Sequence, residues 1–343
     1  MTNTYFSTFI AGTGEIIQEL LYKEICVEKI PILLDGLIVY ETKASVSNIQ
    51  NIPFFNNSFL LLKSFSSLPE NPIPEMMEKS FHDTNLEKTL VAKIKEKNKS
   101  FRIIASQENQ TISVSSILMR NWEKKIQDLL GFSINRSKPD LEFWFLYRRE
   151  GYGFFAMRLT SHTAYEKILE KGELRPELAY IMAALAQAHP EDILLDPFCG
   201  SGAIPFALAL FPNKKIIASD NAKEKIHQLH LKAKLEGKKI EVQCLDALEL
   251  EKVYQNQINK IITDPPWGFF SMQSIDLEEF YSKMMKSFLS ILKRNGKIVA
   301  LIGKKDTFEK VLAKFSLTLE IAKKYDILVS GKKAAIYVLT HYV

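Results

Sequence analysis

The chain has 343 residues, of which 46% are hydrophobic and 25% are charged, and its formal net charge is +5. This composition excludes a mainly disordered chain, and the length is sufficient for two or three domains with separate cores. The net charge is weaker than that of most dedicated nucleic-acid-binding proteins, so it leaves the class of partner open.

The cysteines and the apolar runs exclude several other classes. The three cysteines, Cys26, Cys199 and Cys244, lie far apart and lack the paired spacing of a zinc site or a disulfide framework. No apolar run reaches the roughly 18 residues of a membrane span, and the N-terminal segment lacks the pattern of a signal peptide. We therefore expect no metal, no membrane association and a cytoplasmic location.

The N-terminal segment predicts a small α+β unit. Strands are expected at 4–11, 36–43 and 58–66, with helices at 14–24 and 45–51. This order is roughly that of a ferredoxin-like unit. A turn-rich break, "SSLPENPIPE", follows it.

The middle of the chain predicts a second α+β segment. Helices are expected between about 74 and 99 and at 113–131, and strands at 101–106, 141–147 and 152–160. The N-terminal half contains no evident catalytic cluster, which is typical of a module that holds the substrate.

Basic residues gather in this middle segment: Lys88, Lys93, Lys95, Lys97, Lys99 and Arg102, with Arg148 and Arg149 further on. For any single lysine a solvated helix face is the better explanation. As a group on a separate domain, these side chains could contact the phosphates of an RNA without reading its sequence.

The C-terminal half alternates short apolar runs with amphipathic helices, the pattern that builds a parallel sheet. Strands are expected at 192–196, 215–220, 240–246, 260–264 and 296–303, and helices at about 202–211, 221–236, 276–293 and 306–315. Lys293 and Arg294 are expected to close the third of these helices. A terminal hairpin turning at Ser330 and Gly331 completes the segment. This α/β architecture resembles the Rossmann-like, seven-stranded class I S-adenosylmethionine-dependent methyltransferases.

A glycine-containing turn follows the first of these strands. In "LLDPFCGSGAIPFALAL", Asp196 ends the strand, and Gly200 and Gly202 precede a helix. Glycines allow a ligand to approach the backbone closely at the carboxyl edge of the sheet. The spacing differs from the G-x-G-x-x-G of dinucleotide-binding proteins, which argues against a nicotinamide cofactor. Cys199 is expected to be a small buried residue of this loop, because no base lies near it in the sequence.

Acids also end the next two strands. Asp220 can accept both hydroxyls of a ribose, and Asp246 can accept the exocyclic amine of adenine. Taken singly, each aspartate is explained as a helix cap. Together with the glycine loop, the three acids predict a pocket shaped for adenosine.

The fourth strand ends in Asp264, Pro265, Pro266 and Trp267. In an arbitrary protein a rigid turn would explain this sequence. Here it resembles the [D/N/S]-P-P-[Y/F/W] signature of methyltransferases that modify planar nitrogens. The resemblance implies that the Asp264 carboxylate and the Pro265 carbonyl accept the two amine hydrogens, that Pro266 keeps them in place, and that Trp267 stacks on the base.

Upstream, "GELRPELAYIMAALAQ" is similar to the helix that opens the catalytic domain of THUMP-containing RNA methyltransferases, although a plain helix start with proline explains it equally well. The combination "LRPELA", "LDPFCGSG" and "DPPWG" resembles the tRNA and rRNA guanosine-N2 methyltransferases. That family implies a ferredoxin-like domain at 1–67, a THUMP-like RNA-binding domain at 68–160 and a methyltransferase domain at 161–343. Its implied cofactor contacts are Arg175, Pro176, Asp196, Pro197, Phe198, Cys199, Gly200, Gly202, Asp220, Asn221, Asp246 and Ala247.

The chain is therefore expected to be an S-adenosylmethionine-dependent enzyme that methylates the exocyclic N2 of a guanosine in tRNA, without a metal and as a monomer. An rRNA guanosine-N2 enzyme shares every catalytic feature, and an adenine-N6 enzyme acting on a nucleic acid fits the tetrapeptide. A protein-glutamine methyltransferase typically has Asn-Pro-Pro-Tyr, and a non-enzymatic RNA-binding protein would not need the complete set of motifs. Trp267 stands where Tyr, Phe or His is more usual, which leaves guanine and adenine open as the target base.

Overall fold

The computed structural model describes residues 2–66, 72–160, 173–268 and 276–342. The chain divides into two compact units. The first combines Met1–Phe9 with Gln18–Lys167, and the second combines Ile10–Ile17 with Ile168–Val343. The expected domain boundary near residue 67 and the start of the expected domain at 161 fall on residues outside the described ranges.

The first six elements form a split βαββαβ arrangement. They are β1 (Asn3–Thr8), α1 (Gly14–Glu24), β2 (Val27–Leu34), β3 (Leu37–Thr42), α2 (Val46–Gln50) and β4 (Asn57–Ser66). The strands lie in the order β2-β3-β1-β4, and each neighbouring pair is antiparallel. This is the ferredoxin-like order that the sequence predicts.

Strand β2 is not among the strands that the sequence predicts. Its segment contains Pro31, which cannot donate to a neighbouring strand and therefore argues against a strand. The structure places β2 at the edge of the sheet, where a missing donor is tolerated, and its pairing with β3 shifts register between Lys29 and Ile32.

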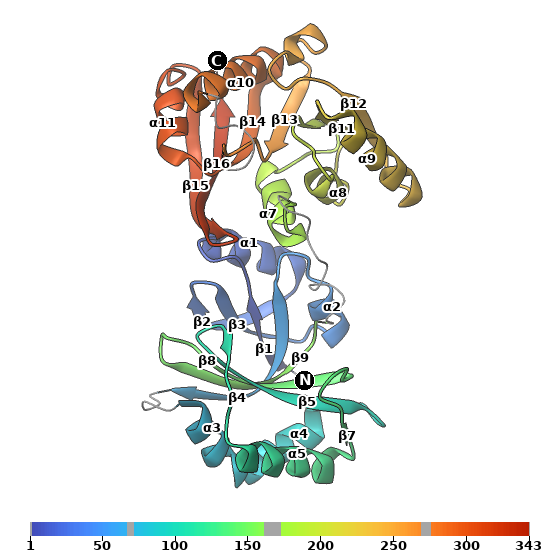
Figure 1. The fold of residues 1–343 in the computed structure, drawn as a ribbon, viewed down its shortest axis with the longest axis vertical. Helices are drawn as coiled ribbons and strands as arrows, with labels where there is room; N and C mark the ends of the chain where they lie inside the picture. The colour runs from blue at the N-terminus through green and yellow to red at the C-terminus, as the bar shows by residue number, and fades with distance from the viewer. Residues whose placement is uncertain (1, 67–71, 161–172, 269–275, 343) are drawn as a thin grey trace. The chain divides into compact units, whose positions relative to one another are not determined.

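The remaining strands of the first unit extend the same sheet, and three helices accompany them. They are α3 (Pro72–Phe81), α4 (Thr84–Lys93), β5 (Ser100–Gln107), β6 (Gln110–Thr111), α5 (Ser116–Leu130), β7 (Ser133–Ile134), β8 (Leu141–Tyr147) and β9 (Tyr152–Arg158). The described strands form one sheet in the order β2-β3-β1-β4-β9-β8-β5-β6, with β7 beside β5. Helices α3, α4 and α5 gather on one face of it (Figure 1).

Aromatic packing anchors these helices to the sheet. Trp122 of α5 is fully buried, with its ring centroid 5.0 Å from that of Phe145 and 5.2 Å from that of Phe155. Its indole N–H donates to the carbonyl of Met77 in α3 at 3.1 Å. Because the N–H has a partner, the largest side chain of this core is buried without a polar cost.

The second unit contains α7 (Pro176–Ala186), β10 (Ile193–Asp196), α8 (Ala203–Leu208), β11 (Lys215–Asp220), α9 (Lys223–Leu235), β12 (Ile240–Cys244), η1 (Leu250–Lys252), β13 (Ile258–Thr263), α10 (Leu277–Ile291), β14 (Leu292–Ile302), α11 (Lys305–Ala313), β15 (Leu319–Val329) and β16 (Lys332–His341). Its seven-stranded sheet has the order β12-β11-β10-β13-β14-β16-β15. The first five strands are parallel to their neighbours, and β16 runs antiparallel between β14 and β15. The α/β fold class and the terminal hairpin are confirmed.

One boundary differs from the prediction. Lys293 and Arg294 were expected to close a helix, but α10 ends at Ile291 and both residues begin the long strand β14. The Lys293 ammonium donates to the side-chain oxygen of Asn259 at 3.2 Å instead of to a helix carbonyl. Basic residues are favoured both at a helix end and on a solvated strand, so composition alone does not separate the two.

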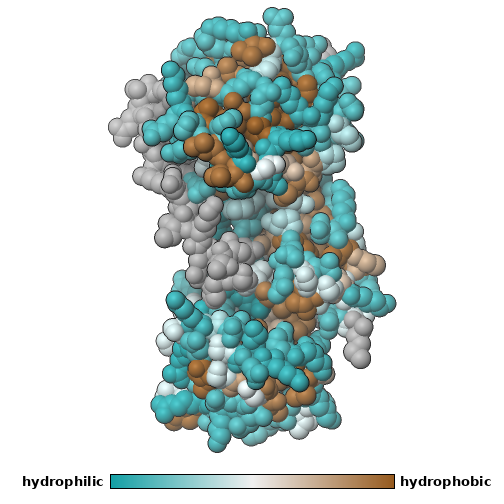
Figure 2. All heavy atoms as spheres, turned by 90° about the vertical axis from the view of Figure 1, so that its right-hand side faces the viewer, coloured by the Kyte–Doolittle hydropathy of each residue, from teal (hydrophilic) through white to brown (hydrophobic). Residues whose placement is uncertain are grey.

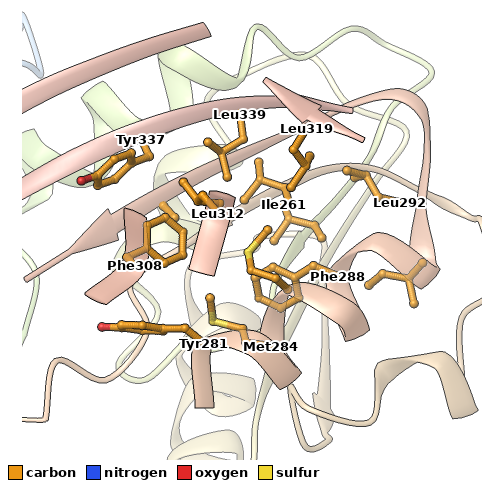
Figure 3. Packing of buried hydrophobic residues seen from close by; sticks show 14 of the residues in the cluster. Ile261, Tyr281, Met284, Phe288, Leu292, Phe308, Leu312, Leu319, Tyr337 and Leu339 are labelled. Atoms are coloured by element: carbon orange, nitrogen blue, oxygen red, sulfur yellow. The ribbon is translucent and has the colours of Figure 1, made fainter. Parts of the chain in front are cut away.

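Alternate residues of the strands face two different helix layers. Ile217 of β11 belongs to the core beneath α10 and α11, whereas the next residue, Ala218, packs with Leu229 of α9. Figure 3 shows Phe288 of α10 directed toward side chains of the sheet, and Tyr281 of the same helix beside Phe308 of α11, with ring centroids 5.3 Å apart. Both faces of the parallel strands are thus covered, which leaves the carboxyl ends of the strands as the edge available for a ligand.

The surface carries mainly polar side chains on the face of the molecule shown in Figure 2, with hydrophobic side chains in separate patches. Among the described residues, no helix combines the length and the apolar character needed to cross a membrane.

Candidate active site

Three of the predicted acids lie at the carboxyl ends of neighbouring strands in the sheet of the second unit. β10 lies between β11 and β13 in the sheet, with Leu195 opposite Ile217 on one side and Ile261 on the other. Asp196 and Asp220 are the last residues of their strands, and Asp264 directly follows β13. The charges of Asp264 and Asp220 both act on Asp196, in keeping with this arrangement.

Asp196 is nearly inaccessible to solvent, with 1% of its surface exposed. Its Oδ1 accepts the backbone N–H of Phe198 at 3.1 Å, but its Oδ2 has no hydrogen-bond partner in the described structure. Burial raises the pKa of Asp196 well above its usual value, and the nearby Phe198 N–H and Thr263 hydroxyl oppose that rise. A buried carboxylate oxygen without a partner is costly, so this site favours a ligand that can donate to it.

The loop after Asp196 needs its glycines for two different reasons. Gly200 has φ +48°, and a side chain there would meet open space, so its role is conformational. Gly202 has φ +93°, and a Cβ there would lie 2.3 Å from Cδ1 of Leu229. Cys199 in the same loop is buried with Ala218 and Leu229, and burial raises the pKa of its thiol far above the usual value. The prediction that Cys199 is a buried loop residue is confirmed.

Asp220 binds the loop as well as ending its own strand. Its Oδ2 accepts the backbone N–H of Gly200 at 3.1 Å, and its Oδ1 accepts that of Ala222 at 2.9 Å. Each oxygen has a further lone pair for a ribose hydroxyl. Asn221 follows with an exposed side chain.

Asp246 was expected to be the last residue of its strand, but it lies two residues beyond the end of β12. Its side chain is exposed, and its Oδ1 accepts the N–H of Leu248 at 2.9 Å in a local turn. Ala247 beside it is buried. The structure therefore places an exposed acid next to an apolar residue, which suits the edge of an adenine ring.

Asp264 makes a contact with Trp267 that the sequence did not predict. The indole N–H of Trp267 donates to Oδ1 of Asp264 at 2.8 Å. Loss of hydration raises the pKa of Asp264 to about 7, and the hydrogen bond from Trp267 limits that rise. Pro265 is buried, and Pro266 and Trp267 are partly exposed.

The Trp267 ring packs against the end of β14. A Cβ placed on Gly303 would lie 2.5 Å from both Cδ2 and Cε3 of Trp267, closer than atoms can approach. The absence of a side chain at Gly303 therefore makes room for the indole. No sequence signal identified Gly303, because it lies 36 positions after Trp267.

Tyr281 of α10 is another residue that sequence reasoning missed. Its ring is fully buried and its hydroxyl has no hydrogen-bond partner in the described structure. Burial, together with the charge of Asp264, raises the pKa of Tyr281 to about 12. It lies within the helix expected at about 276–293, and no motif in the sequence relates it to Asp264.

The start of α7 holds the residues predicted to lie beside the cofactor. Arg175 precedes the helix with an exposed side chain, and Pro176 is its first residue. Glu177 is buried, its Oε2 has no partner in the described structure, and burial raises its pKa. Helix α7 packs against α8, which starts directly after the glycine loop.

The basic residues expected to contact phosphates differ in exposure and in their partners. Arg148 is buried and donates to Asn109, to Glu150 and to the carbonyl of Asp35, and Arg102 donates to the buried Glu142. These two arginines are structural, contrary to the expectation that they contact phosphates. Lys93 and Lys99 are partly buried, and the exposed members are Lys88, Lys95, Lys97 and Arg149.

The strand edge fits an adenosine-containing methyl donor. Asp196 offers a buried acceptor without a partner, and Gly200 leaves open space beside the backbone. Asp220 and Asp246 supply further carboxylate acceptors. Among the described residues, no cluster of three or more His, Cys, Asp or Glu side chains could hold a metal ion.

Comparison with known proteins supports this interpretation of the second unit. Residues 164–333 match the UPF0020 family, described as RMKL-like, methyltransferase domain. A tRNA (guanine(6)-N2)-methyltransferase of Thermus thermophilus is 26% identical over 208 residues, which cover 59% of this chain and 62% of that protein. A tRNA (guanine(10)-N2)-dimethyltransferase of Methanocaldococcus jannaschii is 32% identical over 148 residues, which cover 40% of each. The matched region thus spans less than two thirds of either relative.

The fold extends the similarity over the whole chain. The crystal structure of TrmN from Thermus thermophilus superimposes with a TM-score of 0.79 at 18% identity, covering 99% of this chain and 100% of that one. The chain therefore has the class I methyltransferase fold in its second unit, and its residues 164–333 are similar in sequence to an RMKL-like methyltransferase domain.

Proposed function

We propose that the protein is an S-adenosylmethionine-dependent methyltransferase that modifies the exocyclic N2 of a guanosine in tRNA. The observation that carries this proposal is the placement of Asp264 and Pro265 at the end of β13, directly beside the glycine loop that follows β10. This arrangement puts two fixed acceptors next to a loop suited to an adenosine cofactor. The two relatives described above are named as tRNA guanine-N2 enzymes, which favours guanine over adenine.

The cofactor-binding residues in this proposal are those at the strand ends and at the start of α7. Asp220 binds the ribose hydroxyls, Asp246 and Ala247 bind the adenine edge, and Asp196 accepts a hydrogen bond from the methionine portion. Arg175 and Pro176 lie near that portion, and the Pro197–Gly202 loop lines the site. When bound, S-adenosylmethionine supplies an electrophilic methyl group on a sulfonium.

The chain's own contribution to the reaction is positioning. The amine of guanine is a weak nucleophile because its lone pair is delocalised into the ring. The Asp264 carboxylate and the Pro265 carbonyl accept its two hydrogens and thereby direct the lone pair out toward the methyl group. Pro266 fixes the backbone that carries both acceptors. Asp264 would accept the proton that the amine loses when it receives the methyl group.

The first unit has the substrate-binding role in this proposal. Residues 1–67 are a ferredoxin-like domain and residues 68–160 a THUMP-like RNA-binding domain, joined through the pairing of β4 with β9. The exposed Lys88, Lys95, Lys97 and Arg149 would contact phosphates of the tRNA. Such contacts hold an RNA without reading its bases, so the choice of nucleotide depends on where the tRNA is held.

The experiment that tests this proposal measures transfer of labelled methyl groups from S-adenosylmethionine to unmodified tRNA, ribosomal RNA and double-stranded DNA, offered separately. The proposal predicts that tRNA accepts the label and that the other two remain at background. Label in ribosomal RNA alone would support the rRNA alternative, and label in DNA alone would support an adenine-N6 enzyme.

A further inference from the structure

We propose that Gly303 is a positioning residue for Asp264 and acts through Trp267. By leaving room for the indole, Gly303 keeps the Trp267 N–H on Oδ1 of Asp264 and reserves Oδ2 for the substrate amine. The kinetic part of this inference rests on the proposed function, whereas its structural part can be measured without substrate.

The geometry ties the three residues into one unit. The indole N–H reaches Oδ1 of Asp264 at 2.8 Å, and the ring atoms Cγ, Cδ2 and Cε3 occupy the space that a side chain at Gly303 would need. A Cβ there would lie 2.8 Å from Cγ and 2.5 Å from each of the other two atoms. The backbone of Gly303 is not in the left-handed region, so the glycine is required for space and not for backbone conformation.

This contact changes the role of the tryptophan. A ring that only stacked on the base could be replaced by Tyr or Phe, whereas a ring that also donates a hydrogen bond to the carboxylate can be replaced by neither without loss. Phe has no hydrogen-bond donor, and Tyr carries its O–H at the far end of the ring and not at the position of the indole N–H. In the described structure no side chain or backbone group donates to Oδ2 of Asp264, so that oxygen stays available as an acceptor.

Gly268 gives the turn the conformation that the contact requires. Its φ is +74°, and a Cβ there would lie 2.8 Å from Cδ1 of Leu277 at the start of α10. The residue after Trp267 is therefore restricted both in conformation and in space. The turn is packed from β14 on one side and from α10 on the other.

The kinetic test uses Gly303→Ala with a matched control in the same strand. Gly303→Ala should lower kcat/KM for methyl transfer about tenfold or more, while the dissociation constant for S-adenosylmethionine stays within about twofold. In a protein that already carries Trp267→Ala, the Gly303→Ala change should lower kcat/KM less than about twofold, because no ring remains to be displaced. Gly296→Ala is the control: its Cβ would lie 2.5 Å from Cγ of Leu292 and 2.6 Å from the carbonyl oxygen of Lys293, so it also crowds β14, but near the amino-terminal end of that strand and away from Trp267.

A pH profile separates positioning from a general structural role. Trp267→Phe removes the hydrogen bond that favours the ionised carboxylate, so the acidic limb of kcat/KM should move to higher pH. Gly303→Ala should move it in the same direction, and Gly296→Ala should not. Asp196 of β10 and Tyr281 of α10 are the titratable groups that interact with Asp264, and all the variants retain both.

A structural readout does not depend on activity. The chain has three tryptophans, so a nitrogen–proton correlation spectrum contains three indole signals, and Trp267→Phe identifies the one of interest. That signal should titrate with Asp264, should lose its titration in Asp264→Asn, and should shift in Gly303→Ala but not in Gly296→Ala. If Gly303→Ala leaves both the signal and the pH profile unchanged, or if Gly296→Ala alters them as much, the inference is wrong. The expected spectra in a protein that transfers no methyl group would contradict the proposed function alone.

Discussion

The backbone N–H of Gly200 donates a hydrogen bond to Oδ2 of Asp220 at 3.1 Å, which joins the loop after β10 to the end of β11. The second carboxylate oxygen accepts the N–H of Ala222 at 2.9 Å. One side chain thus holds both backbone segments in place. The acid that we assign to the ribose therefore also maintains the loop against which the cofactor lies.

Replacement of Asp220 should weaken cofactor binding through both roles. For Asp220→Ala we expect the dissociation constant of S-adenosylmethionine to rise about 10- to 100-fold, the effect of losing charge-assisted hydrogen bonds. Calorimetric titration measures it. Asp192→Ala is the matched control, because Asp192 lies before β10, at the opposite end of that strand, and accepts the N–H of His189. Equal losses in the two variants would argue against the ribose assignment.

Asp264 should be needed for transfer but not for cofactor binding. We expect Asp264→Ala and Asp264→Asn to lower kcat at least about 100-fold, the size of effect seen when an electrostatic group of an active site is removed. Asn keeps the shape of the side chain but brings a donor to one position, so it should not restore activity. Single-turnover kinetics of methyl transfer to tRNA measure the loss of transfer, and calorimetric titration with S-adenosylmethionine measures whether cofactor binding is retained. Turnover at the wild-type rate in either variant would exclude Asp264 from catalysis.

The pH dependence of activity should follow the Asp264 carboxyl group. Burial raises its pKa to about 7, and the substrate amine needs the ionised form as acceptor. We therefore expect kcat/KM to increase as the pH rises through about 7 and then to level off. A rate that is flat between pH 6 and 8, with cofactor saturating, would show that the ionised carboxylate is not required.

The stability of the fold should change with pH in the opposite direction. A carboxyl group whose pKa is raised on folding stabilises the folded state below its usual pKa, and that contribution is lost as the pH rises through about 7. The free energy of unfolding of the wild type should therefore fall, relative to Asp264→Asn, as the pH rises over this range. Denaturant unfolding at several pH values measures the difference, and a difference that stays constant would refute the raised pKa.

The exposed lysines that follow α4 should contribute to tRNA binding through phosphate contacts. Lys95→Glu combined with Lys97→Glu should weaken tRNA binding and lower the slope of log affinity against log salt by about 1 to 2, with cofactor affinity unchanged. Filter binding at several salt concentrations provides the slope. Lys214→Glu, at the amino-terminal side of β11, is the control. A slope unchanged in the double variant would place the RNA elsewhere on the surface.

The parallel sheet was predictable because each of its strands carries its own local signal. Asp196 and Asp220 end their strands as the sequence predicts, since an apolar run followed by an acid and a helix start marks both ends. The strand β2 was not predictable in the same way. Pro31 argues against a strand because proline has no N–H to donate to a neighbouring strand. The proline is tolerated because β2 lies at the edge of the sheet, a position that the local sequence does not reveal.

The continuous sheet of the first unit also depends on long-range contacts. β4 pairs with β9, with Phe59 opposite Arg158, and no local pattern relates two segments so far apart in sequence. The surroundings of Asp264 likewise depend on long-range contacts that no local sequence pattern predicts. The tetrapeptide could be recognised from its own residues, whereas its contact with Gly303 and its closeness to Tyr281 arise only from packing.

The central claim is methyl transfer to N2 of guanosine, and nucleoside mass spectrometry of unmodified tRNA incubated with the protein and isotope-labelled S-adenosylmethionine tests it most directly. We expect labelled N2-methylguanosine with the wild type and none with Asp264→Ala, although that variant still binds the cofactor. Label in N6-methyladenosine, or no labelled nucleoside from a protein that binds both cofactor and tRNA, would contradict it.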